Sequence, residues 1–417
     1  MHKPIQPLLI STNDIDGGAA RATYRLHRSL QAIDIPSQML VQNKQSVDST
    51  VIAQKATISK VGAMLNHLPL HPYRDRSRTM FSAQWFPDPV VAKVAQLQPD
   101  LVHLHWVCNG YMQIESLAKF NRPLVWTLHD MWPFTGGCHY SQSCDRYTQT
   151  CGKCPLLKSQ YELDASRWIW QRKAKTYQAL NLTVVAPSQW MADCARSSKL
   201  FQNIRIEIIP HGLDTNTFKP IEQTVARHLL NLPLNQQLVL FGAGSGAVGD
   251  PRKGFHLLQT ALQDLRQTGW GDRLELVIFG ASQADQPIEF GFKAHYLGRF
   301  HDDIALALVY AAADVMIVPS MQEAFGQTAS EALACGTPVI AFKSTGVQDI
   351  VAHQQDGYLA TPFDSSDLAK GIAWVLADAE RQKQLRHQAR QKAETEFALT
   401  LQAERYLNLF HEVLKNS

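Results

Sequence analysis

The chain has 417 residues, which is long enough for two domains, each with a hydrophobic core of its own. Hydrophobic residues make up 45% of the chain and charged residues 18%, a balance that suits a globular protein and excludes a disordered one. The 40 basic and 37 acidic residues leave a net charge of only +3, which argues against a general nucleic-acid binder.

The N-terminal residues run directly into a strand-like segment and lack the longer apolar core of a signal peptide. The sequence contains no continuous apolar run of about 18 residues, which is the length needed to span a bilayer. We therefore expect a cytoplasmic protein, with peripheral contact to the inner face of the cell membrane left open. In that compartment the seven cysteines should be mostly reduced thiols.

Short apolar runs alternate with amphipathic segments along the whole chain, a pattern typical of strand–helix–strand units and parallel sheets. A turn-forming segment, residues 211–220, separates two groups of strands. We expect an α/β chain with domains over 1–215 and 216–397, and a final helix at 398–417 that packs back on the first domain. The predicted strands are 7–12, 37–41, 100–106, 124–129, 182–186 and 204–209 in the first group, and 238–242, 274–279, 294–297, 315–318 and 338–341 in the second.

A glycine loop follows the first strand. Gly17 and Gly18 lie in it, and apolar residues at spacings of three and four come after them, so the glycines are predicted to open a helix. The segment from 43 to 99 shows the weakest pattern in the chain. It nevertheless contains a basic and aromatic stretch beginning at Tyr73, and a similar stretch covers residues 167–175. Such stretches can rest on anionic lipid headgroups, although a solvated helix face with half-buried tryptophans explains them equally well.

Strand 124–129 ends on His129, at the edge of the sheet where open parallel sheets bind ligands. Four cysteines follow closely, at positions Cys138, Cys144, Cys151 and Cys154. Four thiols in a short segment with a Cys-x-x-Cys pair suggest a structural zinc site, because thiolates bind Zn²⁺ tetrahedrally. Disulfides and unliganded thiols remain the alternatives.

The second half begins with a glycine-rich loop between a strand and a helix, residues 241–254. A backbone rich in glycine can approach phosphates closely, and Arg252 with Lys253 can neutralise a diphosphate. Taken alone, a glycine-rich run is also typical of a plain loop.

A polar loop after strand 315–318 is the most informative feature. It contains Glu323 and runs through Phe325, Gly326 and Gln327 into a helix that carries Glu331. A helix N-terminus attracts phosphate, because its N–H groups and dipole favour negative charge. Each carboxylate can accept hydrogen bonds from a vicinal diol of a sugar or ribose. The alternative is that both glutamates only cap and solvate a helix.

The stretch from Glu323 to Glu331, with the Cys-Gly-Thr-Pro turn that follows, resembles the donor signature of family 4 retaining glycosyltransferases. This resemblance implies the GT-B fold, in which two Rossmann-like parallel-sheet domains face a central cleft. The sequence around His129 and the cysteines is similar to that of bacterial exopolysaccharide and colanic-acid-type glycosyltransferases with a cysteine-rich insert. One departure is Ala243, which stands where the family usually has an arginine, so that role is transferred to Arg252.

By the same resemblance, Glu323 would contact donor-sugar hydroxyls, the Phe325–Gln327 backbone the sugar and diphosphate, and Glu331 the ribose. Lys253 matches the family's lysine–glycine pair, and the Gly17–Gly18 loop would face the donor phosphates. His129 corresponds to a histidine that contacts the transferred sugar. The catalytic set implied is therefore His129, Glu323, Arg252 and Lys253.

The implied reaction is transfer of a sugar from a nucleoside diphosphate sugar to a saccharide or lipid-linked saccharide, with retained configuration. Basic residues can stabilise the leaving diphosphate, and no Asp-x-Asp metal motif follows a strand, so no cofactor is expected to be required for catalysis. A nucleotide-sugar epimerase on the same fold and a two-lobed sugar-binding protein are the rival interpretations.

Overall fold

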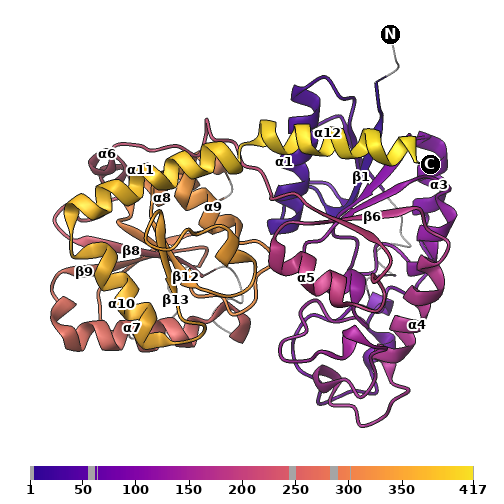
Figure 1. The fold of residues 1–417 in the computed structure, drawn as a ribbon, viewed down its shortest axis with the longest axis horizontal. Helices are drawn as coiled ribbons and strands as arrows, with labels where there is room; N and C mark the ends of the chain where they lie inside the picture. The colour runs from indigo at the N-terminus through magenta and orange to yellow at the C-terminus, as the bar shows by residue number, and fades with distance from the viewer. Residues whose placement is uncertain are drawn as a thin grey trace. The chain divides into compact units, whose positions relative to one another are not determined.

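The computed structural model describes residues 4–54, 62, 64–243, 250–281, 290–300 and 302–416. The chain forms two compact units, one of residues 1–212 with 399–417 and the other of residues 213–398 (Figure 1). The sequence places the division after residue 215, whereas the structure places it after Gly212. Residues 244–249 of the predicted glycine-rich loop lie outside the described ranges.

The first unit is built on a parallel sheet of seven strands within the described residues. The strands in spatial order are β3 (Val51–Ala53), β2 (Gln38–Asn43), β1 (Pro7–Asn13), β4 (Leu101–Leu104), β5 (Leu124–Thr127), β6 (Leu182–Ala186) and β7 (Arg205–Ile208). The helices of this unit include α1 (Gly18–Ala32), α3 (Val90–Leu97), α4 (Ala165–Tyr177), α5 (Gln189–Ser197) and α12 (Leu399–Lys415).

The final helix α12 packs on this first sheet although it comes last in the chain. Leu409 and Phe410 share one buried apolar cluster with Leu26 and Leu30 of α1 and with Leu9 of β1. Figure 1 shows α12 in yellow beside α1. The amphipathic pattern that predicts this helix therefore corresponds to a face that closes the core of the first unit.

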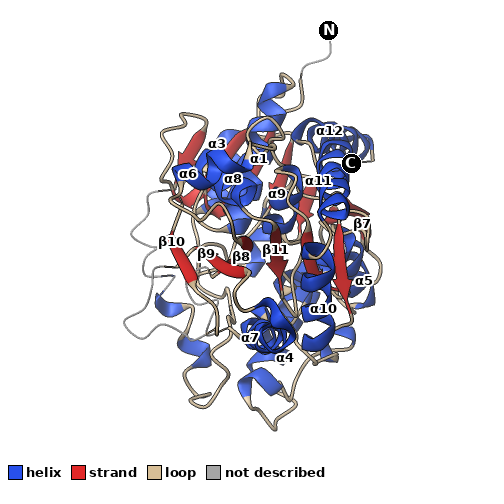
Figure 2. Cartoon of the chain, turned by 90° about the vertical axis from the view of Figure 1, so that its left-hand side faces the viewer, coloured by secondary structure: helices blue, strands red, loops and turns tan. Residues whose placement is uncertain are grey.

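The second unit has a six-stranded parallel sheet in the described residues, with helices on both faces. Successive residues of β8 point to opposite faces: Leu238 packs with α8 and α9, whereas Val239 packs with α7 and α10. In Figure 2, α8 and α7 lie on opposite sides of β8 and β9. The strands in order are β10 (Ala294–Gly298), β9 (Leu274–Phe279), β8 (Gln237–Gly242), β11 (Val315–Val318), β12 (Val339–Phe342) and β13 (Gly357–Ala360); the helices are α6 (Gln223–Leu229), α7 (Phe255–Leu265), α8 (Asp303–Ala312), α9 (Gln327–Ala334), α10 (Ser365–Leu376) and α11 (Ala379–Glu396).

Two edge strands are missing from the sequence prediction. Strand β3 has only three residues, and β13 contains no β-branched residue, so neither carries the usual strand signal. The predicted strands 100–106 and 124–129 are also too long, because regular pairing ends at Leu104 and Thr127. In the described parts of the chain, no helix combines the length and apolar character needed to cross a membrane.

Candidate active site

The second unit brings three loops together at one edge of its sheet. Strands β8, β11 and β12 are neighbours, and all run in the same direction. Their carboxyl ends therefore meet at the same edge, which is where open parallel sheets bind ligands. The predicted residues Arg252, Lys253 and Glu323 follow β8 and β11 at this edge.

Lys253 and Glu323 form an ion pair at this edge, with 2.6 Å between Lys253 Nζ and Glu323 Oε2. The two residues are 70 positions apart in the chain, and both side chains are partly exposed. Arg252 is oriented separately by Asp250, whose Oδ2 accepts a hydrogen bond from Arg252 Nη2 at 2.6 Å. The structure thus places a carboxylate and a cation side by side where the sequence predicts sugar and phosphate contacts.

Gly254 makes the Lys253–Glu323 ion pair geometrically possible. Its φ is +66°, and a Cβ atom added there would lie 1.8 Å from the Pro319 carbonyl oxygen. The loop after β8 is also fastened to the loop after β11 by a hydrogen bond of 2.6 Å from Met321 N to Arg252 O. Only a glycine allows the two backbones to approach this closely in a left-handed conformation.

Helix α9 begins at the same edge. Gly326, its N-cap, has a φ of +106°, and Gln327 is the first helical residue. Phe325 is buried against Phe397, with ring centroids 5.8 Å apart. Glu331 is 5% exposed and accepts a hydrogen bond of 2.8 Å from the buried Tyr310 hydroxyl, so it is held firmly within the unit.

In the first unit, Gly17 and Gly18 lie exposed at the carboxyl end of β1, at the start of α1. Gly17 has φ +96° and ψ +160°, a region that residues with a side chain almost never adopt. A Cβ atom at Gly17 would meet no atom within 4 Å, so only the backbone conformation demands glycine there.

His129 belongs to a cluster of four histidines at that edge, of which the sequence analysis selected only this one. His105 Nδ1 lies 3.0 Å from His129 Nε2, and the His211 ring stacks on His129 with centroids 5.0 Å apart. His103 lies beneath, 4.2 Å from the His105 ring. The available signal was the spacing of His103, within strand Leu101–Leu104, and His105, just after it, because residues two apart along an extended chain point to the same side.

Burial keeps these imidazoles neutral. It lowers the pKa of His103 to about 3 and that of His211 to about 4, where Arg25 contributes further. Burial, followed by the neighbouring histidines, also holds the pKa values of His105 and His129 well below 6.5. At neutral pH the partly exposed His129 ring can therefore exchange hydrogen bonds with a ligand but adds no charge.

A second buried network fixes the segment after β5. Asp130 Oδ2 lies 2.6 Å from His139 Nδ1, and His139 Nε2 lies 2.9 Å from Ser82 Oγ. The buried Lys173 donates to the carbonyl oxygens of Trp132 and Thr135. Burial lowers the Lys173 pKa to about 7. Lys173 belongs to the predicted surface stretch 167–175, but it is buried in the unit. The other residues were not identified from the sequence, because their partners lie up to 57 positions away.

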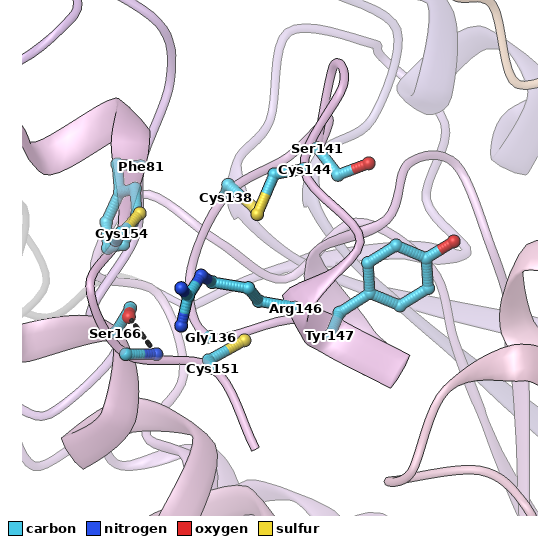
Figure 3. Close-up of a pocket in the computed structure, with 11 residues that line it drawn as sticks. Phe81, Gly136, Cys138, Ser141, Cys144, Arg146, Tyr147, Cys151, Cys154 and Ser166 are labelled. Atoms are coloured by element: carbon cyan, nitrogen blue, oxygen red, sulfur yellow. Dashed lines mark hydrogen bonds between the residues drawn. The ribbon is translucent and has the colours of Figure 1, made fainter. Parts of the chain in front are cut away.

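The four cysteines after β5 line one small cavity of about 20 Å³ (Figure 3), and the Arg146 side chain lines it with them. All four are free thiols, so the disulfide alternative is not present in this structure. Burial raises the pKa of Cys151 to about 12 and that of Cys154 to about 11. Within the described residues, no three His, Cys, Asp or Glu side chains are arranged to hold a metal ion. Zinc binding stays a prediction that requires the thiols to move closer.

Two family profiles match this chain. The profile for glycosyltransferase family 4 matches residues 16–217, and the profile for glycosyl transferases group 1 matches residues 244–392. Together they cover more than half of the chain, including both sheet edges. The chain is a glycosyltransferase.

Individual proteins agree with this assignment. The glycosyltransferase is 27% identical over 374 residues to a D-inositol 3-phosphate glycosyltransferase of Saccharomonospora viridis, covering 85% of this chain and 80% of the relative. It is 25% identical over 285 residues to the putative colanic acid biosynthesis glycosyl transferase WcaC of Escherichia coli, covering 61% of this chain and 62% of WcaC. The crystal structure of Anabaena HepE in complex with UDP and glucose aligns with a TM-score of 0.64 at 19% identity, over 98% of this chain and all of HepE. The latter likeness supports the predicted GT-B fold.

Replacing Gly254 by alanine should destabilise the second unit of the glycosyltransferase, because the new Cβ would collide with the Pro319 carbonyl. We expect a loss of more than about 2 kcal/mol in the free energy of unfolding, measured by urea denaturation. Gly269→Ala is the matched control, since Gly269 has a φ of +89° but no atom within 4 Å of an added Cβ. Equal losses in the two variants would show that the close approach contributes nothing.

We expect the stability of the folded chain to depend on pH through the His211 imidazole. Its folded pKa of about 4 lies below the ordinary value of 6.5, so the unfolded chain takes up this proton first as the pH falls. Stability should decline between about pH 6.5 and pH 4, by up to about 3 kcal/mol from this group. Urea denaturation at several pH values should show a shallower decline for His211→Asn. His411→Asn, at an exposed position of α12, should leave the wild-type slope unchanged.

If the cysteine cluster binds zinc, elemental analysis of chelator-washed protein should find about one zinc ion per chain. Four thiolates complete a tetrahedral site. Cys151→Ser should remove most of that zinc. Cys194→Ser is the control, since Cys194 lies on α5 and is not among the residues that line the cavity. Well under one zinc ion in the wild type would assign the cluster to unliganded thiols.

Proposed function

We propose that this glycosyltransferase moves a sugar from a nucleoside diphosphate sugar to a hydroxyl acceptor, with retained configuration at the anomeric carbon. The acceptor proposed is a saccharide or lipid-linked saccharide used in exopolysaccharide or cell-surface glycan synthesis. The observation that carries the donor assignment is the Lys253–Glu323 pair of 2.6 Å beside the start of α9. Among the similar structures, Anabaena HepE has been crystallised with UDP and with UDP-glucose, which supports a nucleotide-sugar donor.

The chemistry proposed at this edge separates two charges. In the reaction, the acceptor oxygen bonds to the anomeric carbon, the bond from that carbon to the diphosphate oxygen breaks, and the acceptor proton passes to the leaving phosphate. Lys253, Arg252 and the positive end of α9 would stabilise the negative charge on the diphosphate. Glu323 would accept hydrogen bonds from the sugar hydroxyls, and Glu331 would hold the ribose.

Lys253 is suited to contact both the donor diphosphate and Glu323. Its Nζ is held by Glu323 in this structure, so it is already positioned before a donor arrives, and preorganised charge contributes most to catalysis. His129, as a neutral imidazole, would contact the transferred sugar. The Gly17 loop, which is exposed at the start of α1, would face the donor phosphates.

The matching family profiles both describe glycosyltransferases, and neither supports the epimerase or the sugar-binding alternative. Donor sugar, nucleotide base and acceptor are left to experiment. A panel of UDP-, GDP-, ADP- and dTDP-sugars should reveal one donor from which nucleoside diphosphate is released.

With that donor, Lys253→Ala should lower kcat by about 10²- to 10³-fold, the range seen when one preorganised stabilising group is removed. Release of nucleoside diphosphate is the measurement. Lys293→Ala is the matched control, since Lys293 forms an ion pair of 3.3 Å with Glu275 in the same unit, away from the proposed site. An unchanged rate in Lys253→Ala would contradict the proposed role.

Turnover should also persist in a chelator, because basic residues carry the charge that a divalent ion would otherwise neutralise. Loss of all turnover in chelator, restored by magnesium or manganese, would overturn that part of the proposal.

A further inference from the structure

Two other histidines of the first unit hold the His129 ring. His105 Nδ1 lies 3.0 Å from His129 Nε2, and the His211 ring stacks on the His129 ring at an interplanar angle of 16°. The backbone of His105 is itself fixed, because its N–H donates to the Ile10 carbonyl at 2.9 Å and its carbonyl accepts from Trp126 Nε1 at 3.1 Å. The His129 ring is therefore oriented with its Nε2 toward His105.

The other ring nitrogen of His129 is the one left for a ligand. Within the described ranges, His129 Nδ1 makes no hydrogen bond to the protein, and the ring is partly exposed. His129 follows β5 at the carboxyl edge of the sheet, where open parallel sheets bind ligands. A ligand at this edge can therefore bond to Nδ1, but not to the Nε2 that His105 already occupies.

The contact between the two rings holds one hydrogen atom. Both rings are neutral at neutral pH, because burial holds the pKa values of His105 and His129 well below 6.5. A neutral imidazole carries a proton on one nitrogen and a lone pair on the other. Either His105 Nδ1–H donates to His129 Nε2, or His129 Nε2–H donates to His105 Nδ1. The two cases give opposite tautomers of both rings.

The far side of the His105 ring distinguishes the two cases. The residue is only 3% exposed, and its Nε2 is a buried atom without a hydrogen-bond partner among the described residues. In folded proteins, buried N–H groups left without an acceptor are rarer than buried acceptors with an unused lone pair. Nε2 of His105 therefore carries the lone pair, and the proton of His105 is on Nδ1.

His103 repeats the arrangement beneath His105. Its Nδ1 is also buried without a partner in the described parts of the chain, whereas its Nε2 lies 2.8 Å from Thr127 Oγ1. The Thr127 hydroxyl in turn lies 2.7 Å from the Tyr406 hydroxyl. In both histidines, a proton on the bonded nitrogen avoids an unpaired buried N–H group.

We propose that His105 is a positioning residue whose Nδ1–H donates to His129 Nε2 and so fixes the proton of His129 on Nδ1. His129 then presents a hydrogen-bond donor at the sheet edge, and the ligand atom that it contacts is a hydroxyl oxygen of the transferred sugar. The sugar contact rests on the proposed function above. The tautomer is a property of the chain alone.

The tautomer can be measured on the full chain without any donor, by long-range ¹H–¹⁵N NMR of protein labelled with ¹⁵N-histidine. A protonated imidazole nitrogen resonates far upfield of a bare one, and Nε2 is recognised by its couplings to both ring C–H protons. The His129 signals are those lost in His129→Gln. We expect a protonated Nδ1 and a bare Nε2 in the wild type at neutral pH. A protonated Nε2 would overturn the proposal, whether or not any variant folds.

His105→Leu removes the donor, so the two nitrogen resonances of His129 should move toward each other as its tautomers exchange. His105→Asn places an amide N–H₂ group where Nδ1 stands and should keep the wild-type spectrum. His27→Leu is the matched control, because His27 is equally buried in this unit but is hydrogen-bonded to Ser37 and Thr50. Unchanged His129 resonances in His105→Leu would overturn the positioning role.

The consequence for turnover is tested with the donor that the nucleotide-sugar panel identifies. His105→Leu should lower kcat by about 10- to 100-fold with little change in KM, because slight misplacement of a substrate-contacting group can cost that much. His105→Asn should restore most of the rate. A protonated Nδ1 in the wild type together with an unchanged kcat in His105→Leu would overturn the sugar contact of His129, which belongs to the proposed function, and would leave the tautomer assignment standing.

Discussion

Parallel strand direction is the constraint on which both units depend. Because every strand in a sheet runs the same way, each connection must cross back as a helix or long loop, and every strand ends at the same edge. Loops that are far apart in sequence then meet without any specific attraction between them. His105 and His129 meet in this way in the first unit, and Lys253 and Glu323 meet in the second.

The first unit buries several polar groups near the edge of its sheet, among them His103, His105 and Thr127. His103 is hydrogen-bonded to Thr127, and Thr127 is hydrogen-bonded to Tyr406 of the last helix. His105 is hydrogen-bonded to His129. A chain of neutral hydrogen-bonded groups avoids the cost of burying charge while it fixes each ring in place. The same chain connects α12 to the strand ends, so the end of the sequence helps to position the candidate site.

Segment 80–84, in the part of the chain with the weakest sequence pattern, gains its structure from long-range contacts. Ser82 is bonded to His139, and Gln84 is bonded to carbonyl oxygens beyond β4. Arg172 of α4 donates to the carbonyl oxygens of Ala83 and Gln84. Such a segment has no periodicity to read, because polar partners elsewhere in the fold specify its path.

The sequence by itself determined the two-sheet α/β organisation, most strands, the helices opened by Gly17 and Gly326, and the motif from Glu323 to Glu331. These features depend on periodicity and on local backbone chemistry, which neighbouring residues encode. Tertiary structure alone decided that Lys253 pairs with Glu323, that Gly254 must be glycine, and that His105 and His211 surround His129. It also decided that Trp85 and Trp168, one from each basic and aromatic stretch, line one hollow, because contacts between distant segments arise only when the sheet places their loops side by side.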